Sequence, residues 1–181
     1  MGKLVSKTYG DALFSVAMEE LRVDEFYESA QVIRNSLQEN RDFCKLLEHP
    51  EIAKEKKVKM IEDSFLNQIP KEMVGLMILL VSKGRTSEIL AVFEYFIDLV
   101  RETKRIGKAS VTTAVPLSDQ QKEKVEKKLL ETTKYESFEM DYCVEPTLIG
   151  GMVIRIGDRV VDSSIKTKLY DLSRNLRNIQ V

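Results

Sequence analysis

The stretch VRETKRIGKASVTTAVP, residues 100–116, contains the change of pattern that decides the fold. Up to Arg105, apolar residues recur every three or four positions, which is the spacing of amphipathic helices. After Arg105, apolar residues alternate with small or polar ones as in a strand, at Ala109, Val111, Thr113 and Val115. Pro116 ends the alternation. The sequence therefore predicts a mainly α-helical protein with a smaller α/β part, divided into residues 1–105 and residues 106–181.

Upstream of this stretch the sequence predicts a six-helix bundle. Turn and cap residues separate the later helices, at Asp24, Asp42, Pro50, Pro70, Gly84, Thr86 and Ser87. We expect Asp24 and Asp42 to be N-caps, Pro70 to stand in a first turn, and Gly84 to form a left-handed C-terminal cap. The first helix has apolar residues on two sides, and the fifth, over residues 73–81, has almost no polar side. A helix that is apolar all round must be covered all round, by other helices or by another protein.

Downstream of residue 116 the sequence predicts a small mixed domain. Ser118 and Gln121 form a capping box that opens a helix. A second strand alternates in polarity over residues 138–144, and a later pair, Gly157 and Asp158, is typical of a two-residue hairpin turn. The last helix begins at Ser163 or Ser164 and carries an apolar seam with coiled-coil spacing, at Ile165, Leu169, Leu172, Leu176 and Ile179.

Composition excludes several classes of function. The chain of 181 residues has 28 basic and 29 acidic side chains, a net charge of -1, so its overall field selects neither nucleic acid nor an acidic membrane surface. Its longest apolar run is six residues, 76–81, whereas a membrane span needs about 20. The N-terminus has no signal or transit pattern, so we expect folding in a cytosol-like compartment.

Catalytic and metal-binding residues are scarce. His49 is the one histidine and precedes Pro50, which predicts a surface loop position. Cys44 and Cys143 lie in segments of different character, which argues against a disulfide framework and against a zinc site. The sequence contains no nucleophile elbow, phosphate-binding glycine loop or HExxH motif. An ordinary hydrolase is therefore not expected.

Two segments resemble a known family. Residues 9–17, YGDALFSVA, resemble the first-helix pattern of the delta subunit of F-type ATP synthase, the family of the mitochondrial oligomycin-sensitivity-conferring protein. Residues 114–118 followed by Gln121, and residues 148–165, LIGGMVIRIGDRVVDSSI, resemble its C-terminal signature in order and spacing. The signature residues are Gly150, Gly151, Gly157, Asp158, Asp162 and Ser164. Gly10 departs from the usual alanine, and Ser163 stands where glycine is common.

The resemblance implies a fold and a role. Members of the family have a six-helix N-terminal bundle and a smaller α/β domain, and they join the catalytic head of the synthase to its peripheral stalk without catalysis, cofactor or metal. The bundle receives the N-terminal helix of an alpha subunit between its first and fifth helices, and the C-terminal domain meets the ends of the b subunits. The residues this implies for the alpha helix are Tyr9, Ala12, Leu13, Phe14, Met73, Met77 and Leu80.

The resemblance also implies a peripheral location on the cytoplasmic side of a bacterial inner (plasma) membrane. Since the apolar seams await unlike partners, we expect the isolated chain to be a monomer. Residues 1–105 should fold alone and bind the alpha helix, and residues 106–181 should carry the stalk contacts.

Alternatives stay open at this stage. The first-helix residues could all belong to the bundle core, and the Ile165 to Leu176 seam could simply cover the sheet. Gly150 and Gly151 could form a phosphate loop, but no helix follows them directly, so a strand start or bulge is the preferred interpretation. Asp158 and Asp162 are explained by a turn and a helix start rather than by a metal. Two other functions remain: a generic helical adaptor, or a small enzyme using residues 150–162.

Overall fold

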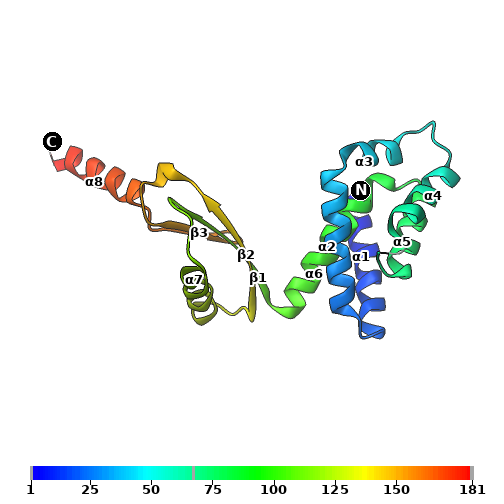
Figure 1. The fold of residues 1–181 in the computed structure, drawn as a ribbon, viewed down its shortest axis with the longest axis horizontal. Coiled ribbons are helices and arrows are strands. Elements are labelled where there is room, and N and C mark those ends of the chain that lie inside the picture. Colours follow the sequence, from blue (N-terminus) through cyan, green and yellow to red (C-terminus); the bar gives the residue numbers. More distant parts are fainter. Residues whose placement is uncertain (1, 67, 180–181) are drawn as a thin grey trace. The chain divides into compact units, whose positions relative to one another are not determined.

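A computed structural model of the chain describes residues 2–66 and 68–179, with side chains for residues 4–66 and 68–174. It contains two compact units, Met1–Glu102 and Thr103–Val181 (Figure 1). The boundary lies close to the end of the helix α6 (Ile89–Lys104), where the sequence pattern changes at Arg105. The predicted class, a helical region followed by a small α/β part, is confirmed.

Helices are the only regular secondary structure in the described residues of the first unit. Its other elements are α1 (Gly2–Glu19), α2 (Val23–Glu39), α3 (Arg41–Glu48), α4 (Lys54–Phe65), α5 (Lys71–Ser82) and the 3-10 turn η1 (Thr86–Glu88). The apolar residues that recur at helical spacing in α2 and α6 are buried, at Phe26, Ala30, Ile33, Leu37, Ile89, Phe93, Phe96 and Val100. Full burial of a valine, leucine, isoleucine or phenylalanine side chain contributes about 1.5–3 kcal/mol to stability. One core cluster therefore holds the helical unit together.

Some predicted helix ends are wrong by one or two residues. Asp24 and Asp42 lie inside the first turns of α2 and α3, because Arg22 and Asn40 occupy the N-cap positions. Pro70 is itself the N-cap of α5 rather than a first-turn residue. Thr86 and Ser87, expected as caps, lie within η1.

The left-handed cap predicted at Gly84 is confirmed. Gly84 has a φ of 71°, and the following Arg85 N–H donates to the Leu80 carbonyl at 2.8 Å. This hydrogen bond satisfies a carbonyl at the end of α5 and turns the chain sharply into η1.

The second unit is a four-stranded sheet with two helices. Its elements are β1 (Ile106–Thr113), α7 (Asp119–Thr132), β2 (Ser137–Val144), the 3-10 turn η2 (Pro146–Leu148), β3 (Met152–Ile156), β4 (Arg159–Asp162) and α8 (Ile165–Ile179). The strand order is β2-β1-β3-β4. The strands β1 and β2 are parallel and joined through α7, while the β1–β3 and β3–β4 pairs are antiparallel. Val115, predicted in the first strand, follows its end and is exposed.

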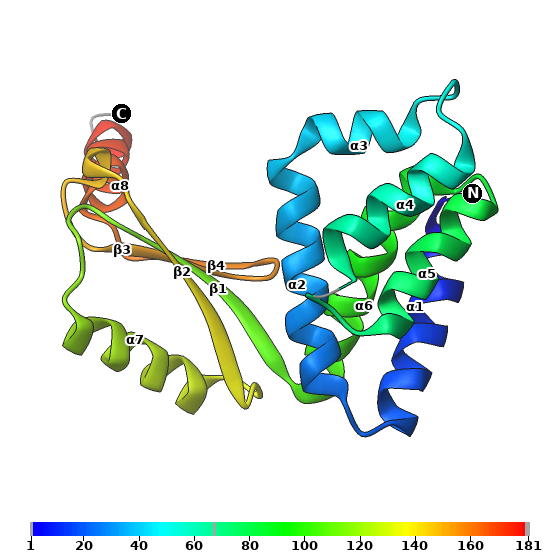
Figure 2. The same ribbon diagram turned by 45° about the vertical axis from the view of Figure 1, so that its right-hand side comes forward.

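The helix α7 covers one face of this sheet (Figure 2). The predicted capping box opens α7, with the Ser118 N–H donating to the Gln121 side-chain oxygen at 2.9 Å. Leu129 of α7 packs with Ala109 and Phe138 in a small core. The strand register puts further apolar residues on the same face, at Val111, Met140, Tyr142, Ile154 and Ile156. The core of this unit thus consists of one helix packed on one face of the sheet, and much of the sheet stays exposed.

Candidate functional site

The helices α1 and α5 run side by side in opposite directions (Figure 2). Arg22, after the end of α1, lies 3.7 Å from a carboxylate oxygen of Glu72 at the start of α5. At the other end, the guanidinium of Arg85, just after α5, lies 5.8 Å from the ring centroid of Tyr9. These two contacts join the C-terminal end of α1 to the start of α5, and the middle of α1 to the segment just after α5.

One side of α1 faces α6 rather than α5. The Tyr95 hydroxyl donates to Asp11 at 3.0 Å, and the rings of Phe14 and Phe96 lie 6.5 Å apart between centroids. The opposite side of α1, which includes Tyr9, therefore faces α5.

The outward residues between these two helices form what we call the α1–α5 face. It consists of Val5, Tyr9, Ala12 and Val16 of α1, spaced by 4, 3 and 4 positions, and Leu76 and Leu79 of α5. Ala12 is exposed and Leu79 is 42% exposed, whereas the others are half-buried. The face is thus apolar and partly exposed. The small side chain of Ala12 leaves a shallow depression in it, where a second helix could approach closely.

The predicted partner-binding residues do not all lie on this face. Tyr9 and Ala12 do. Four others are core residues in the free chain, with exposures of 4% or less, at Leu13, Met73, Met77 and Leu80. Phe14 packs on the α6 side. A partner could touch the four core side chains only if the helices separated, whereas Phe14 is half-buried. As contact residues all five stay a prediction.

The sequence analysis did not identify Leu76 and Leu79. In a helix that is apolar all round, no polar side marks the surface that faces solvent. The sequence therefore does not say which side of the helix faces the core. Their neighbours in α5 point inward because α4 and α6 cover that side, which only the tertiary structure shows.

The six signature residues form two separate groups. Gly157 and Asp158 make the predicted turn between β3 and β4, with Gly157 at a φ of 54°. At the far end of this hairpin, Gly150 and Gly151 lie against the start of α8, next to Ser164. The signature thus fixes both ends of one β-hairpin and the helix that follows it.

The second group fixes where α8 begins. The Ile165 N–H donates to the Gly150 carbonyl at 2.9 Å, and the Ser163 N–H donates to the Met152 carbonyl at 2.9 Å. A Cβ on Gly151, which has a φ of 78°, would lie 2.5 Å from the Ser163 carbonyl oxygen. Only glycine lets these two backbones come so close.

Asp162 and Ser164 cap α8. Asp162 accepts hydrogen bonds of 2.7 Å from the Ser164 N–H and from the Thr167 hydroxyl. The fully buried Ser164 accepts from the Thr167 N–H through its own hydroxyl. The Ser164 N–H, followed by the Thr167 hydroxyl, holds the pKa of Asp162 below its ordinary value. The predicted helix start is confirmed at Ser164.

The lowered pKa of Asp162 predicts acid sensitivity of this cap. The carboxylate stabilises the fold fully above its unfolded pKa, about 3.9, and that contribution is lost as the pH falls through the lower folded pKa. We expect Asp162→Asn to be less stable than wild type at neutral pH and to converge with it below about pH 4. Thermal melts by circular dichroism across this range test it. Parallel stability curves for Asp162→Asn and wild type across this pH range would contradict the assignment.

The seam of α8 is open over its described side chains. Ile165, Leu169 and Leu172 are 42%, 52% and 57% exposed. The side chains of Leu176 and Ile179, which belong to the predicted seam, lie outside the described residues. The described part of the seam therefore does not bury itself against the sheet.

Ionisable residues show no metal-binding arrangement in the described part of the chain. No three His, Cys, Asp or Glu side chains gather there in a way that could hold a metal ion. His49 is exposed at the end of α3, and Cys44 and Cys143 are free thiols. Over the residues that the structure describes, the helices are too short or too polar to cross a membrane.

Known proteins match the chain over nearly its whole length. A sequence model of the ATP synthase delta (OSCP) subunit matches residues 5–176. The ATP synthase subunit delta of Lachnoclostridium phytofermentans is 48% identical over 181 residues, which is all of both chains. That of Brevibacillus brevis is 31% identical over 169 residues, covering 93% of this chain and 96% of the relative.

A solved structure supports the fold. A chain in the cryo-EM structure of the Toxoplasma gondii mitochondrial ATP synthase hexamer superposes with a TM-score of 0.70. The superposition covers 94% of this chain and 96% of that one, at 20% sequence identity. At this identity the likeness establishes the arrangement of elements.

Proposed function

Because the chain belongs to the ATP synthase delta (OSCP) subunit family, we propose that it ties the alpha subunits of the catalytic head to the b subunits of the peripheral stalk. It is a non-catalytic subunit of the F-type ATP synthase, with a stator role. Torque on the rotor pushes back on the head, so a tie to the stalk keeps the head from turning and couples rotation to ATP synthesis or proton pumping.

The α1–α5 face is the proposed site for the N-terminal helix of an alpha subunit, and it is the observation that carries the proposal. An amphipathic helix can lay its apolar side along Tyr9, Val16 and Leu79. The small Ala12 lets the two helix backbones come close. Stable specific interfaces bury about 800 Å² per partner. The extended surface along two antiparallel helices suits an elongated partner such as a helix.

The physical demand on this contact is a slow dissociation rate. The tie must survive many turnovers under load, and affinity differences between related complexes lie mostly in the dissociation rate. Apolar burial against a preformed helical surface meets this demand because little ordering is needed on binding.

The second unit is proposed to meet the C-terminal ends of the b subunits. Its open apolar surfaces, among them the α8 seam at Ile165, Leu169 and Leu172, support this assignment. We propose that the subunit lies on the cytoplasmic side of the bacterial inner membrane, held there through the complex, and that the isolated chain is a monomer.

Binding of the two partner segments tests the proposal. We expect the purified full-length chain to bind both an alpha N-terminal peptide and a b C-terminal segment, and to run as a monomer by light scattering. The fragment 1–105 should be helical by circular dichroism and should bind the alpha peptide alone. A chain that binds neither segment contradicts the stator role, and a folded fragment that ignores the alpha peptide contradicts the division of labour.

A further inference from the structure

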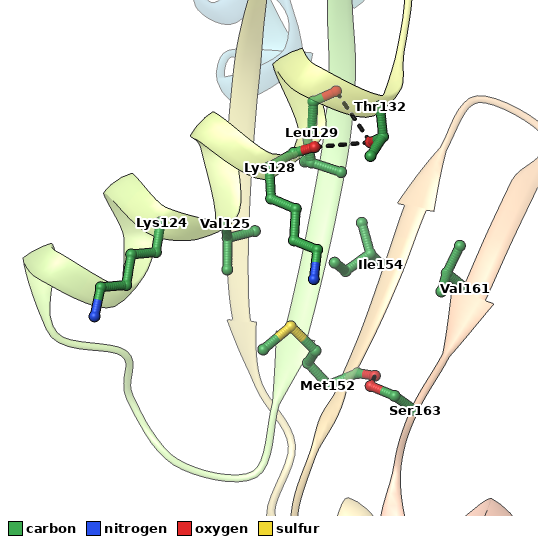
Figure 3. Close-up of a pocket in the computed structure, with 9 residues that line it drawn as sticks. All are labelled: Lys124, Val125, Lys128, Leu129, Thr132, Met152, Ile154, Val161 and Ser163. Atoms are coloured by element: carbon green, nitrogen blue, oxygen red, sulfur yellow. Dashed lines mark hydrogen bonds between the residues drawn. The ribbon is translucent and has the colours of Figure 1, made fainter.

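A hollow of about 490 Å³ lies on the sheet of the second unit, beside α7 (Figure 3). We call it the sheet groove. It is lined by Lys124, Val125, Lys128, Leu129, Thr132, Met152, Ile154, Val161 and Ser163. It exists because one helix of 14 residues covers a four-stranded sheet: α7 packs over the core residues Ala109 and Phe138, and the same face of β3 and β4 stays open.

The floor of the groove is apolar and incompletely covered. Ile154 of β3 pairs in register with Val161 of β4, so both side chains lie on the α7 side of the sheet. Val161 is 60% exposed, although β-branched side chains on a sheet face normally pack against something. Val160, its neighbour, lies on the opposite face of the same strand.

The charged side chains on the lining have one sign. They are Lys124 and Lys128, one helical turn apart on α7, and no acidic residue lines the hollow. Figure 3 shows Lys128 reaching from α7 toward Met152. Acidic residues also occur on α7, at Asp119, Glu123, Glu126 and Glu131, but none belongs to the lining. The lining therefore favours an occupant that is apolar underneath and negatively charged along one edge.

The charge of α8 argues against that helix, or its copy in a second chain, as the occupant. Its described residues carry the seam together with Lys166, Lys168 and Arg174 against one acidic side chain, Asp171. A basic helix beside Lys124 and Lys128 would bring like charges together, and such contacts disfavour a partner. The charge of the lining therefore disfavours α8, from either copy, as the occupant.

We propose that the sheet groove docks an amphipathic helix of the peripheral stalk whose apolar stripe is flanked by carboxylates one turn apart. The inference rests on the proposed stalk function and names the surface that serves it. Apolar side chains of the helix pack on Met152, Ile154 and Val161, and its carboxylates pair with Lys124 and Lys128. The helix completes the half-covered sheet face, as α7 does over β1 and β2.

Paired substitutions in the full-length chain test the groove. Lys124→Glu with Lys128→Glu reverses the charge of its edge, and Val161→Asp puts a charge on its floor. The matched controls are Lys127→Glu, an exposed α7 residue outside the lining, and Val160→Asp, on the other face of β4. Thermal melts confirm that each variant is folded before binding is measured.

Two kinds of probe separate the groove from the stalk function. One is the C-terminal segment of the b subunit. The other is a designed helical peptide with a leucine stripe and glutamates one turn apart, made also with lysines in place of the glutamates. We expect both groove variants to weaken the b segment and the glutamate peptide at least tenfold, measured by fluorescence anisotropy, with both controls near wild type. The lysine peptide should bind the charge-reversed variant better than wild type.

The outcomes distinguish two failures. If wild type binds the b segment and the groove variants bind it equally well, the stalk function stands and the groove inference is overturned. If wild type does not bind the b segment, the stalk function fails. The groove inference then survives only if the glutamate peptide binds wild type and loses affinity in the groove variants. Equal binding of the glutamate and lysine peptides to wild type would reduce the groove to an unspecific apolar patch and overturn the inference.

Discussion

Ala12→Asp is expected to lower the affinity for an alpha N-terminal peptide at least tenfold while thermal unfolding of the chain stays nearly unchanged. Ala12 is exposed in the centre of the α1–α5 face, so water solvates the new carboxylate in the free chain. In the complex the same charge would be buried, unpaired, against apolar side chains, which costs several kcal/mol at the interface. The lower helix propensity of aspartate costs only about 0.7 kcal/mol.

The adjacent residue provides the contrast. Leu13 is 4% exposed, so Leu13→Asp should unfold the helical unit rather than affect binding selectively. Met18→Asp, an exposed position on the same side of α1 as Phe14, should leave both melting and binding close to wild type. A collapsed melting temperature for Ala12→Asp would assign Ala12 to the core, and unchanged peptide binding would remove it from the interface.

The difference between Ala12 and Leu13 shows how far the sequence could go in the helical unit. The periodicity of α1 identified two apolar sides, and the structure gives one to α5 and the other to α6. In α5 the periodicity gave no such division, because almost no polar residue marks which side of the helix faces solvent. The family resemblance implied Met73 and Met77, which are fully buried in the free chain, and did not include the exposed Leu79.

Local chemistry made the α/β unit more predictable. The capping box at Ser118, the turn at Gly157 and the helix start at Ser164 each depend on residues a few positions apart, and all three are confirmed. The sheet groove could not be predicted, because it depends on how much of the sheet α7 covers. In the sequence, Lys124 and Lys128 are interleaved with glutamates and show no separate edge.

One departure from the family pattern also has a tertiary cause. An alanine Cβ at position 10 would clash with the ring of Tyr95, whose hydroxyl donates to Asp11. Gly10 therefore lets α6 lie against α1 with an aromatic ring at the contact. The helix propensity that it sacrifices, about 1 kcal/mol relative to alanine, is offset by this packing.

Gly151→Ala is expected to destabilise the second unit by about 3 kcal/mol. A left-handed backbone conformation costs a residue with a Cβ about 1–2 kcal/mol, and overpacking adds about 1–3 kcal/mol. Here the new Cβ would meet backbone, the Ser163 carbonyl oxygen at 2.5 Å and the Ser164 Cα at 3.0 Å, neither of which can rotate away as a side chain could. Hydrogen exchange of the sheet amides in the full-length chain measures this loss without mixing in the helical unit.

Gly157→Ala separates the steric cost from the conformational one. Gly157 also has a positive φ, 54°, but a Cβ there would have open space around it, so only the conformational cost of about 1 kcal/mol applies. If both substitutions lower the free energy of unfolding by the same amount, the close backbone approach at Gly151 makes no separate contribution to stability. The clash should also affect binding, because its relief requires Ser163 and Ser164 to move. The helix α8 begins at the next residue, Ile165, whose N–H donates to the Gly150 carbonyl. Gly151→Ala should therefore weaken binding of the b C-terminal segment at temperatures where the sheet is still folded, whereas Gly157→Ala should not.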